Sequence, residues 1–119
     1  MLVLYHDFEI PRTPPSLNIM LRAHWRKKSV EQGIWDAYVS AEWDRACKFV
    51  FPCPVRVIYT LWFPAAINRD IDNYTGGTKF ITDALKRTFL TRDDYKWLQE
   101  IVVRIGKGPE KTSIRIEVI

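Results

Sequence analysis

The sequence predicts an α+β fold: a small single domain with a mixed β-sheet and two main helices packed on it. Segments with apolar residues at alternate positions, typical of strands, occur near both ends and in the middle of the chain. Two segments with helical spacing of apolar residues lie between them, which gives the order β, α, β, α, β, β. Because 119 residues is the size of one compact domain, we expect residues 1–119 to form a single domain.

The first half of the chain predicts a strand, a loop and a helix. Residues 2–10 alternate in polarity and stop at Pro11, as a strand does. Three prolines make residues 11–18 an ordered or clamping loop, and a basic run with an aromatic residue inside it follows at 22–28. From about Ser29 to Phe51, apolar residues recur every three or four positions and predict an amphipathic helix: Trp35, Val39, Trp43, Ala46 and Val50.

The second half predicts a strand, a helix and a hairpin. Residues 55–63 are β-branched and aromatic, and Pro64 closes this strand. The segment from about Thr75 to Leu90 has helical spacing, although Gly76 and Gly77 move its expected start to Thr78. Alternating segments at 98–105 and 112–119 are separated by glycines and a proline, which is typical of a β-hairpin.

Composition limits the location and the partners of the protein. The formal net charge is +4 and the sequence pI about 9.2, which favours contact with phosphate backbones. No apolar run is long enough for a membrane span and the first residues do not form a signal peptide, so we expect a cytoplasmic protein with no membrane contact. Cys47 and Cys53 have no cluster of histidines nearby, so we expect reduced packing residues.

Acidic residues gather after the central strand of this basic chain. On extended backbone, Asp70 and Asp72 leave the chain on the same face and can converge on one cation. Lys79 and Asp83 follow one helical turn apart, and Asp93-Asp94 returns in the next loop. Carboxylates are the natural ligands of Mg²⁺, which can activate water and neutralise a scissile phosphate. The alternative is a helix cap, a Lys79–Asp83 surface pair and an exposed turn.

The same string carries a family resemblance. Arg-Asp-x-Asp-Asn from Arg69, then Lys-x-x-x-Asp-Ala-Leu from Lys79, then Asp93-Asp94, resembles the RusA family of Holliday junction resolvases, many of which are carried by phages and prophages. Residues 12–18, with Pro14-Pro15-Ser16 and Asn18 after a first strand, also resemble the N-terminal signature of that family. Two departures are a longer interval between Asp72 and Lys79 and the residues Tyr95-Lys96-Trp97 after the last acid.

The resemblance implies an enzyme, its metal and its substrate. It implies a Mg²⁺-dependent endonuclease, with Mn²⁺ as a substitute, that acts as a homodimer and nicks two strands of a four-way DNA junction symmetrically. Asp70, Asp72 and Asp94 match the essential metal-binding acids and Lys79 the catalytic lysine. Asp93 matches a further acid that we group with the metal ligands, and Asp83 a recurrent acid without an assigned role.

Cations outside the acidic string predict the DNA contacts. The expected phosphate-binding residues are Arg22, Arg26, Lys27, Lys28, Arg69 and Lys96. Trp25 can stack on an unpaired base; alternatively this run is a solvated loop with Trp25 in the core. His6 and His24 are expected to be structural, and the Trp35, Val39 and Trp43 stripe to be core or dimer interface.

Two rival functions stay open. One is a non-catalytic DNA-binding module of the same fold, whose binding ignores Mg²⁺. The other is a metal-dependent nuclease on flaps, forks or RNA, because the same acids serve any phosphodiester.

Overall fold

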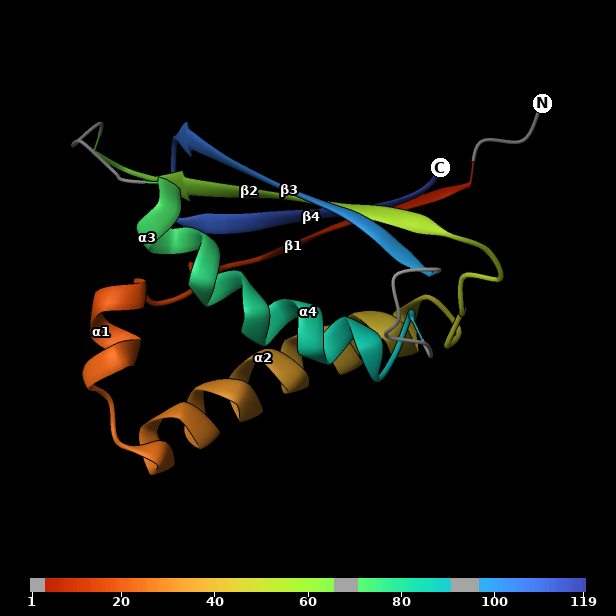
Figure 1. The fold of residues 1–119 in the computed structure, drawn as a ribbon. Helices are drawn as coiled ribbons and strands as arrows, with labels where there is room; N and C mark the ends of the chain where they lie inside the picture. The colour runs from red at the N-terminus through yellow and green to blue at the C-terminus, as the bar shows by residue number, and fades with distance from the viewer. Residues whose placement is uncertain (1–3, 66–70, 91–96) are drawn as a thin grey trace. The chain divides into compact units, whose positions relative to one another are not determined.

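The computed structural model describes residues 4–65, 71–90 and 97–119, except the side chains of Leu17 and Asp72. Figure 1 shows α+β architecture in these residues, with a mixed sheet and separate helices. The predicted class is therefore confirmed. The elements in chain order are β1 (Tyr5–Ile10), α1 (Leu17–Arg22), α2 (Trp25–Arg45), β2 (Val55–Phe63), α3 (Ile71–Thr75), the 3₁₀ turn η1 (Gly76–Thr78), α4 (Lys79–Lys86), β3 (Leu98–Lys107) and β4 (Lys111–Val118).

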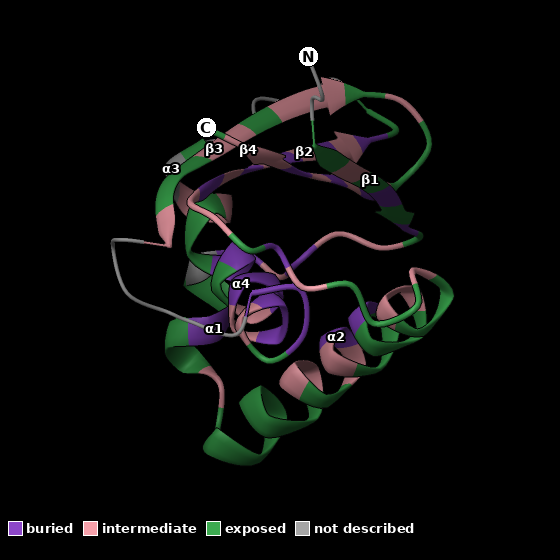
Figure 2. Cartoon of the chain, turned by 90° about the vertical axis from the view of Figure 1, so that its right-hand side faces the viewer, coloured by how far each residue is buried: buried purple, intermediate pink, exposed green. Residues whose placement is uncertain are grey.

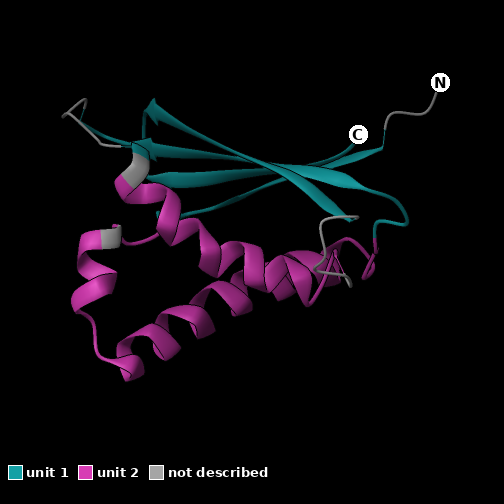
Figure 3. Cartoon of the chain, viewed as in Figure 1, with its two compact units in different colours: residues 1–13, 51–71, 92–119 teal, residues 14–50, 72–91 magenta. Residues whose placement is uncertain are grey.

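The chain divides into two compact units, coloured in Figure 3. The sheet unit consists of residues 1–13, 51–71 and 92–119 and contains all the strands described above. The helical unit consists of residues 14–50 and 72–91 and contains α1, α2, η1 and α4. Each unit is therefore built from segments that are distant in the sequence. The single domain and the packing of the two main helices on the sheet stay predictions.

The sheet has the order β1-β4-β2-β3 in the described residues. β4 is antiparallel to β1 and β2, whereas β3 is parallel to β2. The predicted hairpin of the last two strands is therefore wrong, because β2 lies between them. After β3, the backbone N–H of Gly108 donates to the carbonyl of Phe63 at 3.0 Å, so the chain turns at the end of β2 and returns on its other side.

One face of β2 forms the centre of the sheet unit's core. Val55, Val57, Tyr59 and Leu61 have no exposed surface, and the residues between them are half-buried. This alternation confirms the strand predicted at 55–63 and follows from the period of two in a strand. Buried residues are purple in Figure 2. Ion pairs occupy other positions of the sheet unit, including Lys111 with Glu9 at 2.8 Å.

Helix α2 begins and ends earlier than predicted. It starts at Trp25 rather than Ser29, because the Nδ1 of His24 accepts from the backbone N–H of Arg26 at 3.2 Å and caps the helix. It ends at Arg45 rather than Phe51. Cys47 and Lys48 both have φ of 55°, and this left-handed turn stops the helix. Cys47 is a free, exposed thiol, so its predicted packing role is wrong, while Cys53 is free and half-buried.

Helices α2 and α4 form the core of the helical unit. Trp35 and Val39 of α2 are fully buried, which confirms the core interpretation for these two members of the predicted stripe, whereas Trp43 is half-buried. Buried residues of α4 recur at helical spacing, as predicted, at Ile81, Ala84 and Leu85. Among the helices that the structure describes, none combines the length and the apolar character needed to cross a membrane.

Candidate functional site

The predicted metal ligands fall mostly outside the described residues. Asp70, Asp93 and Asp94 lie there, as do two predicted DNA contacts, Arg69 and Lys96. The backbone of Asp72 is described and is helical, within α3. The predicted extended backbone is therefore wrong at Asp72. Strand alternation therefore gives no direction for the side chain of Asp72.

The two sequence motifs meet within the helical unit. The backbone N–H of Asn18, from the Pro-Pro-Ser-x-Asn motif, donates to Oδ1 of Asn73, from the acidic string, at 3.1 Å. Close packing adds to this contact. A Cβ built on Gly77 would lie 2.3 Å from the carbonyl oxygen of Pro15 and 3.0 Å from Cβ of Pro14. Glycine is therefore required where the 3₁₀ turn passes the proline loop.

The proline loop starts a helix that the sequence analysis did not predict. Ser16 is extended, and its Oγ accepts from the backbone N–H of Ile19 at 3.4 Å, which is the N-cap arrangement. Helix α1 follows directly at Leu17. Three prolines in the preceding residues favour a loop, and only the serine signals the helix that begins behind them.

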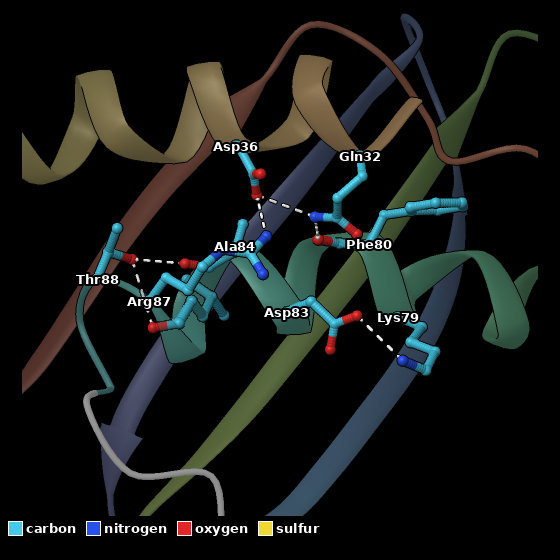
Figure 4. A network of polar contacts seen from close by, with 9 residues as sticks. Gln32, Asp36, Lys79, Phe80, Asp83, Ala84, Arg87 and Thr88 are labelled. Carbon is cyan, nitrogen blue, oxygen red and sulfur yellow. Dashed lines mark hydrogen bonds and ion pairs between the residues drawn. The ribbon is translucent and has the colours of Figure 1, made fainter. Parts of the chain in front are cut away.

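Lys79 and Asp83 form the surface pair that was the alternative interpretation. Nζ of Lys79 lies 3.0 Å from Oδ2 of Asp83, one turn along α4, as Figure 4 shows. The lysine side chain is 78% exposed and the aspartate side chain 28%, so the lysine side chain is mostly open to solvent. An exposed pair of this kind stabilises a helix by at most about 0.5 kcal/mol. A contribution to stability therefore does not account for the presence of Lys79 and Asp83.

The basic run is exposed and helical. Arg22 ends α1, and Arg26, Lys27 and Lys28 lie in the first turns of α2; all four are exposed. The alternative that Trp25 lies in the core is wrong, because this residue is 66% exposed. The guanidinium carbon of Arg26 lies 5.3 Å from the indole centre, within the range of a cation–π contact. His24 is structural, as predicted, since it caps the helix.

A pocket of about 260 Å³ in the helical unit brings the two predicted regions together. Lys28, a predicted phosphate contact, and Lys79, the predicted catalytic lysine, both line it. The other lining residues are Met20, Leu21, Gln32, Gly76, Phe80 and Asp83. The sequence analysis missed Gln32 and Gly76 as site residues, because nothing in their local pattern indicates that α1, α2, η1 and α4 meet around one cavity.

The amide of Gln32 has a fixed orientation beside this pocket. Its Nε2 donates to Oδ1 of Asp36 and to the backbone carbonyl of Phe80, both at 2.9 Å. Arg87 also pairs with Asp36, at 2.5 Å, which holds the carboxylate in place (Figure 4). The contacts of Gln32 therefore join α2 to α4 next to the cavity.

Within the described ranges, no group of three or more acidic, histidine or cysteine side chains is placed to hold a metal ion. Three of the four expected ligands lie outside those ranges, and the side chain of the fourth, Asp72, is not described. No protein-family model matches the chain, and no curated protein matches it.

Proposed function

We propose that this protein is a Mg²⁺-dependent, structure-selective endodeoxyribonuclease of the RusA type that resolves four-way DNA junctions in recombination and repair in the cytoplasm. One observation carries the proposal. Lys28 from the basic run and Lys79 from the acidic string line the same pocket, so a phosphate contact and the expected catalytic lysine are neighbours. The bond between Asn18 and Asn73 further supports the view that the two motifs act as one site.

The expected ligand set suits the expected metal. Asp70, Asp72, Asp93 and Asp94 offer carboxylate oxygens, which hard cations such as Mg²⁺ or Mn²⁺ prefer over nitrogen or sulfur. When bound, such an ion neutralises the scissile phosphate and activates water for attack. The assignment rests on the donor chemistry and on the order of the acids along the chain.

The lysine of the site has a role that its exposure permits. The side chain of Lys79 is mostly solvent-accessible, and Asp83 pairs with its ammonium group. In the proposed reaction it stabilises the charge that develops on the phosphate oxygens, as a preorganised cation does. Arg22, Arg26 and Lys27 hold the neighbouring backbone phosphates by charge.

A homodimer follows from the symmetry of the substrate. The strands of a four-way junction are related in pairs by two-fold symmetry. Symmetric nicks on one such pair require two equivalent active sites. We therefore propose a two-fold dimer in which each copy cuts one strand.

The rival is a non-catalytic DNA-binding module. The exposed Trp25 with its cationic neighbours favours this alternative specifically, because stacking and phosphate contacts need no metal. A nuclease for flaps or forks differs from the leading proposal only in the shape of its substrate.

The test is a cleavage assay with labelled synthetic DNA. Purified wild-type protein is incubated with a four-way junction, a fork and a linear duplex, each with Mg²⁺, with Mn²⁺ and with a chelator. The proposal expects symmetric nicks in the junction only, and only with metal. Cuts mainly in the fork favour the flap or fork nuclease, and tight binding that ignores metal and yields no nicks favours the binding module.

A further inference from the structure

We infer that the pocket of the helical unit binds a single unpaired nucleobase of a DNA strand, with Lys28 and Lys79 at the phosphates on either side of that nucleotide. The inference deepens the proposed function and rests on it. It concerns how the base next to the cut is bound, whereas the acidic string concerns the metal ion.

The walls of the pocket suit the faces of a base. Met20 and Leu21 of α1 and Phe80 of α4 contribute apolar surface. A nucleobase is flat, with two faces that stack on aromatic and apolar side chains. The volume of about 260 Å³ lies below the range of about 300–1,000 Å³ that is usual for drug-sized ligands, so the cavity suits a small ring system rather than a larger molecule.

Gln32 lines this pocket, and its side chain retains a hydrogen-bond acceptor. Both groups that its amide nitrogen contacts, the Asp36 carboxylate and the Phe80 carbonyl, can only accept, so the orientation of the amide is settled. Two contacts use both hydrogens of Nε2. The remaining hydrogen-bonding capacity of Gln32 is that of its carbonyl oxygen, which can only accept. Each DNA base has an N–H hydrogen that forms a Watson–Crick bond in duplex, and this hydrogen is free to donate to Gln32 only when the base is unpaired.

The charges at the pocket suit a nucleotide rather than an uncharged ring. Lys28 and Lys79 come from different helices, α2 and α4, and both line the cavity. Among the lining residues that the structure describes, Asp83 alone carries a carboxylate, and this group is already paired with Lys79. A strand whose base enters the pocket therefore meets a cation from each helix.

The surface beside Lys28 extends the same chemistry. Trp25 precedes Lys28 by less than one turn of α2, and its exposed indole offers a stacking platform for a further unpaired base. Arg26, which lies over this indole, adds charge for the backbone. Together these features favour single-stranded or unstacked DNA, such as the centre of an opened junction, over intact duplex.

The test is a nuclear magnetic resonance titration of the nitrogen-15-labelled protein, residues 1–119, without metal. The probes are deoxyadenosine 5′-monophosphate and, as the base-free control, 2-deoxyribose 5-phosphate. We expect saturable shifts of the Gln32 side-chain amide and the Gly76 backbone amide with the nucleotide only. Equal shifts with both probes, or no shift of these resonances, overturn the inference.

A matched pair of variants tests the location. Leu21 lines the pocket and is 71% exposed, whereas Ile19 on the same helix is 52% exposed and is not among the lining residues. Leu21→Glu and Ile19→Glu add the same charge to α1 at exposed positions, where folding tolerates the change. We expect Leu21→Glu to weaken nucleotide binding about tenfold more than Ile19→Glu, from the loss of one apolar contact with the base. Equal losses contradict the inference.

Failure of this inference can be separated from failure of the proposed function. Wild-type protein from the same preparation is assayed on the four-way junction with Mg²⁺. Junction cleavage without base-dependent shifts removes the base pocket and leaves the nuclease. Base-dependent shifts without cleavage keep the pocket and assign it to a DNA-binding module.

Discussion

Asn73 caps helix α1 from 55 residues away, because its Oδ1 accepts the backbone N–H of Asn18 at 3.1 Å. Asn18 is the second residue of α1, and the first N–H groups of a helix have no partner within it. Ser16 satisfies the N–H of Ile19, and Asn73 satisfies that of Asn18. The start of α1 therefore depends on the segment that also contains Asp72.

Replacement of Asn73 tests this dependence. Asn73→Ala removes the acceptor, and we expect the free energy of unfolding to fall by about 0.5–1.5 kcal/mol, the usual value of one such hydrogen bond. Asn73→Asp keeps an acceptor oxygen and is expected to stay within about 0.5 kcal/mol of the wild type. Urea unfolding followed by tryptophan fluorescence measures both variants. Equal losses in the two show that the acceptor is not what the helix needs.

Replacement by alanine is expected to have opposite effects on stability at Gly77 and at Gly33. At Gly77, an added Cβ meets the Pro15 carbonyl oxygen at 2.3 Å, and this backbone atom cannot shift at low cost. We therefore expect Gly77→Ala to lower the free energy of unfolding by about 1–3 kcal/mol. At Gly33, inside α2, an added Cβ meets nothing within 4 Å. Gly33→Ala is therefore expected to stabilise the protein by about 0.5–1 kcal/mol through helix propensity. Thermal unfolding compares them, and a neutral Gly77→Ala contradicts the close approach.

Lys79 is expected to matter for activity and not for stability. Lys79→Gln removes a mostly exposed ion pair, so the free energy of unfolding should change by less than about 0.5 kcal/mol. Junction cleavage should fall about 10²-fold, the usual cost of losing one preorganised charge-stabilising group. Lys86→Gln on the same helix is the control and should retain cleavage. Similar rates for the two variants remove Lys79 from the mechanism.

Glu9 predicts a pH-dependent contribution to stability in the sheet unit. Hydrogen bonds from Lys111 and then Ser113 lower the pKa of Glu9 below its usual value. A lowered folded-state pKa gives stability that is present above the unfolded-state pKa and is lost as the pH falls through the folded-state pKa. Because the side chain is 56% exposed, we expect Glu9→Gln to cost no more than about 0.5 kcal/mol at neutral pH.

The measurement for Glu9 is urea unfolding of wild type and variant across the acid range. The difference between them should decrease towards zero as Glu9 becomes protonated in the folded protein. A difference that stays constant with pH assigns the effect to packing instead.

The fold could be predicted where the signal is local. The alternation from Val55 to Phe63 marks a strand with one buried face, and the spacing of Trp35 and Val39 marks the core side of α2. The order of strands could not be predicted in this way. Gly106 to Pro109 has hairpin composition, yet β2 lies between β3 and β4, and such pairing of strands distant in the sequence leaves no local signal.

The candidate site was predictable in its residue types and not in its geometry. The Asn73 segment and the Pro14-Pro15 loop stand out as motifs, but their contact joins positions far apart in the chain. Gln32 carries no local sign of its place beside the pocket, because that place arises from the packing of α2 against α4. The exposure of Trp25 likewise depends on where α2 begins. His24 sets this start, because its side chain caps the helix.

The most direct test of the metal-dependent nuclease is a comparison of wild type with Asp70→Asn on a labelled four-way junction in Mg²⁺. The account predicts paired symmetric nicks by the wild type, and junction binding without nicks by the variant, because a neutral side chain weakens the hold on the metal and repels the phosphates less. Tight binding by the wild type with no nicks in Mg²⁺ or Mn²⁺, or equal cleavage by both proteins, would contradict it.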